Sequence, residues 1–139
     1  MPSGRRGKGS IFPGRRAFAH PGKMKNRSFT EYAMPANPSA VLRHVVLFSF
    51  KATASAEQVD SIVTGFAKLK HAIPGIETYE CGTNVSPEGL NDGFTHCFTL
   101  TFASAAARDG YLVHQAHQDF VATLGACLER SLVVDYWTE

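Results

Sequence analysis

Six polar side chains stand inside otherwise apolar segments of the sequence and could take part in proton transfer. They are four histidines, a tyrosine and an aspartate: His44, His96, Tyr111, His114, His117 and Asp135. A neutral imidazole can act as a general base near pH 7, a phenol can hydrogen-bond to a developing oxyanion, and a carboxylate can fix the tautomer of a histidine. Together these residue types indicate acid–base chemistry.

A structural explanation competes for each of these residues. A single histidine on a strand is usually a hydrogen-bonded structural residue, which applies to His44 and His96, and Asp135 could equally hold a neighbouring backbone group. His114 and His117 are three positions apart and could bind a metal together with one of the strand histidines. No carboxylate is placed to complete such a site, so we expect no metal.

The spacing of Tyr111 and His117 constrains any joint role. Six residues correspond to about 240° around an ideal helix. A continuous helix would therefore point the two side chains in different directions. Either the helix breaks near His114, or the two residues do not cooperate.

The segments that carry these residues alternate between strand and helix patterns from Arg43 onward. Apolar residues recur at every second position in the strand segments and at helical spacing after the N-cap residue Ser55. The predicted strands are 44–50, 76–85, 94–102 and 132–137, and the predicted helical regions run from 55 to the Pro74-Gly75 turn and from 104 to about 128.

The resulting order, β-α-β-β-α-β, is that of an α+β, ferredoxin-like fold with helices on one face of an antiparallel sheet. The first strand carries apolar residues on both faces, with Val45 and Leu47 opposite Val46 and Phe48. The uncovered face should therefore also be buried. A second copy of the chain is the economical partner, which predicts a homodimer in the form of an α/β barrel.

The first forty residues have a different composition. They contain eight of the 14 Lys and Arg residues and the single acid Glu31, which leaves a charge of about −5 on the rest of the chain. Residues 1–40 are rich in Gly, Pro and Ser and have no apolar period, so we predict a disordered basic extension before a domain at 41–139. A transit peptide, a nucleic-acid-binding arm and translated upstream sequence starting at Met24 or Met34 remain alternatives. A nucleic-acid partner is not expected for the domain itself.

Cysteine usage and hydropathy limit the cellular setting. The three cysteines, Cys81, Cys97 and Cys127, are odd in number and have no CxxC spacing, so neither a disulfide framework nor a zinc knuckle is indicated. The longest apolar runs are far shorter than the roughly 18 residues of a membrane span. We expect a cytoplasmic protein with no membrane association.

Several fragments in order resemble one known family. They are His44–Lys51, Ile73-Pro-Gly75, Gly93–His96, the run Tyr111-Leu-Val-His-Gln-Ala-His117 with Phe120, and Val134-Asp-Tyr136. Their order and spacing resemble the stress-responsive α/β-barrel (Dabb) family over nearly all of residues 43–137. The family often has His-Pro-x-His where this chain has His114-Gln115-Ala116-His117, and losing the proline removes one reason for a sharp helix break.

The resemblance implies a ferredoxin-like protomer that forms a homodimeric barrel, with a cavity between each sheet and its helices. A plant polyketide cyclase of the family closes a ring by cofactor-free, aldol-type chemistry with a tyrosine and a histidine that match Tyr111 and His117. Its other polar cavity positions match His44, His96 and Asp135. By this resemblance Tyr111 and His117 are the catalytic candidates, the other polar residues, His114 included, are supporting, and no cofactor is expected.

Three functions are therefore open. The first is a cofactor-free acid–base enzyme, a cyclase or lyase of aldol type, acting on a small carbonyl or polyketide-like substrate. The second is a non-catalytic dimeric stress protein or a protein that binds a small apolar ligand. The third is a monooxygenase, cofactor-free or haem-linked, like the antibiotic-biosynthesis monooxygenases that share this barrel architecture. A shared fold alone says little about activity.

Overall fold

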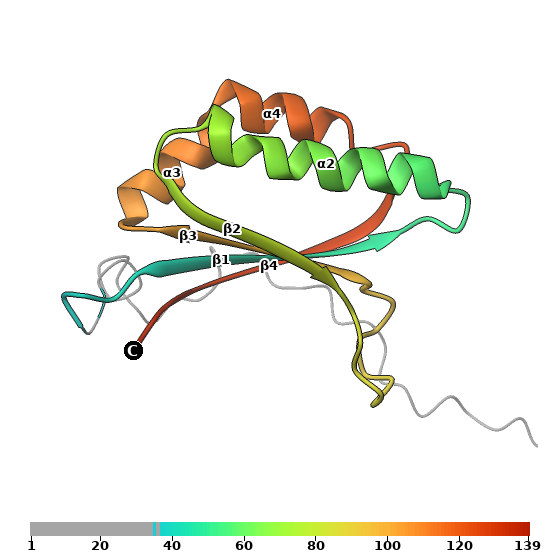
Figure 1. The fold of residues 1–139 in the computed structure, drawn as a ribbon, viewed down its shortest axis with the longest axis horizontal. Helices are drawn as coiled ribbons and strands as arrows, with labels where there is room; N and C mark the ends of the chain where they lie inside the picture. Colours follow the sequence, from blue (N-terminus) through green and yellow to red (C-terminus); the bar gives the residue numbers. More distant parts are fainter. Residues whose placement is uncertain (1–34, 36) are drawn as a thin grey trace, which may run out of the picture. The chain divides into compact units, whose positions relative to one another are not determined.

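The computed structural model describes residue 35 and residues 37–139, and shows an antiparallel sheet covered on one face by helices (Figure 1). The elements in order are β1 (Leu42–Phe50), α2 (Ala56–Ala72), β2 (Ile76–Thr83), β3 (His96–Phe102), α3 (Ala105–Val113), α4 (Gln115–Ala122) and β4 (Leu128–Trp137). The predicted α+β, ferredoxin-like order is confirmed. The predicted basic extension, residues 1–40, lies outside the described residues except for residues 35 and 37–40.

The four strands are arranged in the order β2-β3-β1-β4, so β1 and β3 form the centre of the sheet. His44 of β1 lies opposite Leu100 of β3 on one side and Asp135 of β4 on the other. Directly opposed residues of antiparallel strands share a face of the sheet. Strand pairing alone therefore places His44 and Asp135 next to each other on the face that the helices cover.

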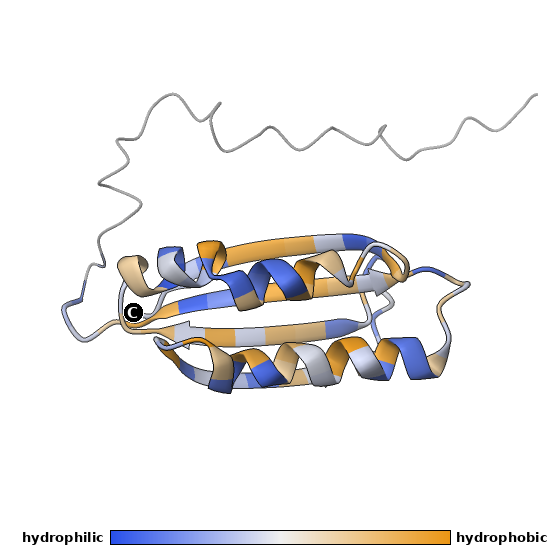
Figure 2. Cartoon of the chain, turned by 90° about the horizontal axis from the view of Figure 1, so that it is seen from above, coloured by the Kyte–Doolittle hydropathy of each residue, from blue (hydrophilic) through white to orange (hydrophobic). Residues whose placement is uncertain are grey.

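The core lies between this face and the helices. On the central strands Phe98, Leu100 and Phe102 are completely buried, and α2 contributes Ile62 and Phe66. Figure 2 shows strands that are largely hydrophobic beneath helices that alternate between hydrophobic and hydrophilic residues. The predicted periodicities therefore identify the buried faces correctly.

Helix α2 begins where the sequence predicts. The Ser55 hydroxyl accepts a hydrogen bond from the Gln58 backbone N–H at 3.1 Å, and the Gln58 side chain accepts one from the Ser55 N–H at 2.8 Å. These two bonds form a capping box, which satisfies two backbone donors that the first turn of a helix leaves free.

Two predicted boundaries near the C-terminus are wrong. The helical region predicted from 104 to about 128 is two helices that end at Ala122, and β4 begins at Leu128 instead of Leu132. The additional residues of β4 continue the ladder with β1, as Leu128 pairs with Phe50 and Ser131 with Phe48 across a register shift. A β-bulge of this kind breaks the alternation that identifies a strand in the sequence.

None of the helices in the described part of the chain has the length and apolar character that a membrane span needs. The three cysteines, Cys81, Cys97 and Cys127, are free.

Candidate active site

The helix does break at His114. Its backbone is extended, with φ −64° and ψ 139°, between the last residue of α3 and the first residue of α4. The His114 Nδ1 accepts a hydrogen bond from the Ala116 backbone N–H at 3.1 Å, so the imidazole acts as the N-cap of α4. The break therefore forms without the proline common in the Dabb family, because His114 supplies the cap with its own side chain.

The break brings Tyr111 and His117 together. Their ring centroids are 4.5 Å apart at an interplanar angle of 46°. Tyr111 is 1% exposed and also packs edge-on against the His44 ring, with centroids 5.6 Å apart. The spacing leaves open either a helix break near His114 or two residues that do not cooperate. The structure has the break, and the two side chains are in contact.

The His44 ring is oriented by a hydrogen bond to Asp135. The His44 Nδ1 lies 2.7 Å from Asp135 Oδ1, and Arg108 Nη1 donates to Asp135 Oδ2 at 2.6 Å. Burial by itself raises the pKa of Asp135, but the hydrogen bonds and charges of His44 and Arg108 outweigh burial and hold the pKa below its ordinary value. Asp135 is therefore ionised at neutral pH and accepts the His44 Nδ1 proton.

A cavity of about 430 Å³ opens next to these side chains, between the sheet and helices α3 and α4. Its volume lies within the range of small-molecule sites. Most of its lining is apolar, and the polar side chains are His44, Tyr111, His117 and Ser131. We call it the Tyr111–His117 cavity, and it can hold an apolar molecule with a polar group at the Tyr111 end.

The protonation states of Tyr111 and His117 suit proton transfer. Burial lowers the pKa of His117, more than its hydrogen bond to the Leu112 carbonyl raises it, and nearby His44 lowers it further. The ring is therefore neutral at pH 7. Because a carbonyl only accepts, the 3.0 Å contact between His117 Nδ1 and Leu112 O assigns the proton to Nδ1 and leaves Nε2 as the basic atom.

Tyr111 remains a donor over the whole neutral range. Burial raises the pKa of its phenol, and the negative charge of Asp135 raises it further. A phenol that keeps its proton can donate a hydrogen bond to an oxygen that becomes negative during a reaction. The cavity therefore contains one base, His117, and one donor, Tyr111, in ring contact.

Two of the predicted supporting residues lie elsewhere. His96 opposes Phe48 on β1, four residues from His44; along a strand this separation is about 13 Å. It packs edge-on against Phe50 and does not line the cavity. His114 acts through the helix break, and among the described residues no three potential metal ligands come together.

Arg108 is a site residue that the sequence reasoning missed. It lies in α3 three residues before Tyr111, on the same side of the helix. The only feature of the sequence that points to Arg108 is its position, a cationic side chain one helical turn before the candidate tyrosine. Its importance depends on Asp135, which is 27 residues further along the chain.

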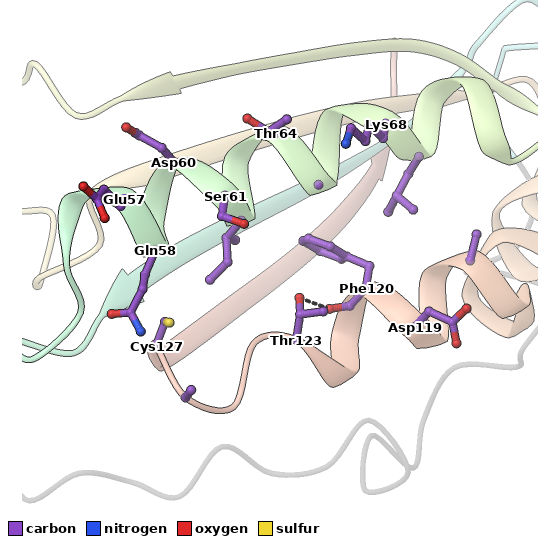
Figure 3. Close-up of a pocket in the computed structure, with 15 residues that line it drawn as sticks. Glu57, Gln58, Asp60, Ser61, Thr64, Lys68, Asp119, Phe120, Thr123 and Cys127 are labelled. Carbon is purple, nitrogen blue, oxygen red and sulfur yellow. Dashed lines mark hydrogen bonds between the residues drawn. The ribbon is translucent and has the colours of Figure 1, made fainter.

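A second, more open depression of about 770 Å³ lies between α2 and α4 (Figure 3). The Phe120 side chain projects from α4 toward α2 and borders both this groove and the Tyr111–His117 cavity. The groove is lined by polar side chains of α2, including Asp60 and Lys68, and contains no histidine or tyrosine. It lacks a base that titrates near neutral pH, so the smaller cavity is the better candidate.

Fold and site together define a small α+β, ferredoxin-like protein with a buried polar cluster. A family model described as the stress responsive A/B barrel domain matches residues 42–138, and the chain belongs to this family. The stress-response A/B barrel domain-containing protein HS1 of Arabidopsis thaliana is 37% identical over 95 residues, which cover 68% of this chain and 87% of the relative.

Two further matches have names that describe chemistry. Olivetolic acid cyclase of Cannabis sativa is 25% identical over 95 residues, covering 68% of this chain and 94% of the cyclase. The solved structure of a hydroxynitrile lyase from Passiflora edulis has a TM-score of 0.69 at 27% identity, covering 73% of this chain and 96% of the lyase. Other matched structures are described as dimeric ferredoxin-like proteins of unknown function.

Proposed function

We propose that this protein is a cofactor-free acid–base enzyme that acts on a small, largely apolar carbonyl compound. The observation that carries the proposal is the ring contact of Tyr111 and His117 at the wall of the 430 Å³ cavity. A neutral base and a phenol donor in an apolar cavity are the groups that enolate chemistry requires. The names of the cyclase and lyase relatives support the same class of reaction.

The proton balance follows from the hydrogen bonds. His117 Nε2 takes a proton from the carbon next to the carbonyl group, while Nδ1–H stays bonded to Leu112 O. The electron pair of the C–H bond moves to the carbonyl oxygen, where the Tyr111 hydroxyl stabilises the enolate. In an aldol-type closure the enolate carbon attacks a second carbonyl of the same molecule, and the new alkoxide takes the proton back from His117.

His44 and Asp135 support this pair. The Asp135 carboxylate accepts the Nδ1 proton of His44 at 2.7 Å, which orients the His44 ring whose edge packs against Tyr111. A lyase reaction on a hydroxynitrile would use the same groups: a base removes the hydroxyl proton, the carbonyl forms, and cyanide leaves with the electrons of the broken C–C bond. Both reactions need one neutral base and one donor.

We further propose that the protein is a homodimer joined through the helix-free sheet face. We call this the open face, and its apolar residues on β1 and β4 are Val45, Leu47, Leu132, Val134 and Tyr136. Val134 and Tyr136 are 53% and 49% exposed. Leaving these side chains in water would be costly, and a second copy would bury them. The description of structures with the same fold as dimeric supports a dimer, and the exposed apolar residues favour this face as its interface.

The enzyme proposal can be tested with acetophenone, a ketone with an apolar body that exchanges its methyl protons slowly at neutral pH. NMR in D₂O measures the exchange rate with the purified full chain. We expect His117→Ala to lower the rate by about 10²-fold or more and Tyr111→Phe by about 10². The matched control is His71→Ala, because His71 is exposed on α2 away from the cavity.

The outcome that contradicts the enzyme proposal is equal exchange in the wild type, in His117→Ala and in Tyr111→Phe. If acetophenone or mandelonitrile, a hydroxynitrile, then still binds the cavity without turnover, the non-catalytic ligand-binding function replaces the enzyme. If both probes react and only Tyr111→Phe is impaired, Tyr111 is the essential group and His117 is not the base.

A further inference from the structure

Arg108 holds the carboxylate that orients His44. The two oxygens of Asp135 are divided between two partners, with Oδ1 2.7 Å from His44 Nδ1 and Oδ2 2.6 Å from Arg108 Nη1. On its other side Arg108 Nε donates to Asp109 Oδ1 at 2.8 Å. Asp135 thus lies between the guanidinium and the imidazole and cannot rotate without breaking one of the two contacts.

The contact is sheltered from solvent. The side chains of Arg108 and Asp135 are 22% and 21% exposed, and that of His44 is 5% exposed. Charge-assisted hydrogen bonds of this length are among the stronger ones, and water weakens this one less than it weakens a surface ion pair. By contrast Asp109 is 59% exposed, so the second ion pair of Arg108 lies largely in water.

We propose that Arg108 is a positioning residue for the acid–base site. It fixes the Asp135 carboxylate so that the other oxygen accepts the His44 Nδ1 proton, which favours the His44 tautomer that carries its proton on Nδ1 and orients the ring against Tyr111. Arg108 does not line the cavity, so it acts through Asp135 and not by touching substrate. The inference rests on the proposed function, since the His44 tautomer matters only if the cavity transfers protons.

The contact with Arg108 also helps to lower the pKa of Asp135. The charged and titratable groups that act on the carboxylate are Arg108 and Tyr111 on α3 and His44 on β1. Arg108 is the permanent cation among them. Without it, the carboxylate would have His44 as its one hydrogen-bonding partner from a side chain and would be freer to rotate or to take up a proton.

The test compares Arg108→Gln with Arg108→Lys, and uses Asp109→Asn as the matched control. Asp109→Asn removes the exposed partner of Arg108 and leaves the Asp135 contact in place. In full-length protein labelled with ¹⁵N-histidine and ¹³C-aspartate, NMR reports the His44 tautomer and the ionisation of Asp135. We expect Arg108→Gln to mix the two His44 tautomers and to raise the pKa of Asp135, Arg108→Lys to preserve both signals in large part, and Asp109→Asn to change neither.

Acetophenone exchange gives a second readout. Misorientation of a supporting group should lower the rate at saturating probe by about tenfold to a hundredfold, with unchanged acetophenone affinity, because Arg108 does not touch the cavity. Arg108→Gln with wild-type NMR signals would overturn the proposal, and so would equal signals in the Gln and Lys variants. If the Arg108 variants show the expected NMR changes but the wild-type protein catalyses no exchange, the proposed enzyme is refuted and Arg108 is left as the group that orients Asp135.

Discussion

Replacing His114 by Ala should separate its role as a helix cap from a role in catalysis. The substitution removes the 3.1 Å hydrogen bond from the Ala116 N–H to His114 Nδ1 and leaves the first turn of α4 with one more unsatisfied donor. Replacing an N-cap by Ala costs about 1 kcal/mol. The cost should appear in the free energy of unfolding, because α4 has only eight residues and no acidic residue in its first turn.

Equilibrium urea denaturation, followed by the fluorescence of Trp137 at fixed protein concentration, measures the loss. With a slope of about 2 kcal/mol per M urea, a loss of about 1 kcal/mol moves the midpoint down by about 0.5 M. His114→Asn is the matched control, because Asn is a favourable N-cap, and it should restore most of the stability and of the acetophenone exchange. Equal midpoints for the Ala variant and the wild type would refute the capping argument. Loss of exchange in the Asn variant at full stability would show that the His114 ring itself takes part in catalysis.

Three further predictions concern pH, the buried ion pair and the open face. Acetophenone exchange should be lost as the pH falls below about 6.5, because burial lowers the pKa of His117 and keeps it neutral above that value; a loss that begins above about pH 7 would contradict this. Asp135→Asn should cost about 1–3 kcal/mol at pH 7 by leaving buried donors without their carboxylate. The difference in unfolding free energy should shrink as the pH falls through the lowered pKa of Asp135, since a depressed carboxyl pKa stabilises the fold fully above the unfolded value and loses this effect as the pH falls through the folded one; equal stabilities at pH 7 would refute the inferred role of the carboxylate. Val134→Glu should convert a dimer into a monomer in sedimentation experiments, whereas Val85→Glu, at a loop position that is 90% exposed, should not; a dimer that survives Val134→Glu would exclude the open face as the interface.

Much of the fold could be predicted from the sequence because its buried faces are periodic. The alternation through β1 identifies the face that carries Val46 and Phe48, both at most 5% exposed. Ser55 marks the start of α2, as its capping box shows. Such local signals do not depend on distant parts of the chain. They are sufficient for the order of elements and for the side of each strand that faces the helices.

The geometry of the site could not be predicted in the same way. Helical periodicity leaves the direction of Tyr111 relative to His117 undecided, because a break at His114 depends on one imidazole that caps the following helix. Neither composition nor spacing reveals that use of a histidine. The family resemblance names the two residues, but this chain lacks the proline, and the structure supplies the alternative cause of the break.

Two other differences come from long-range pairing. His44 and His96 both belong to the helix-covered face, but the register of β1 and β3 separates them by four residues along the strands. The contact of Arg108 with Asp135 joins α3 to β4, which are distant in the sequence. Strand register and helix placement are set by the packing of the whole core. The sequence therefore predicts which residues share a face of the sheet, but it does not predict which of them lie close enough to form one site.

The measurement that tests the central claim most directly is a crystal structure of the full chain with bound acetophenone. The account predicts that the ketone lies in the Tyr111–His117 cavity, with its carbonyl oxygen about 2.7 Å from the Tyr111 hydroxyl and its methyl carbon facing His117 Nε2. Acetophenone bound in the α2–α4 groove of Figure 3 would contradict the assignment of the site. A cavity closed by the side chains that line it would contradict the claim that Tyr111 and His117 act on a ligand.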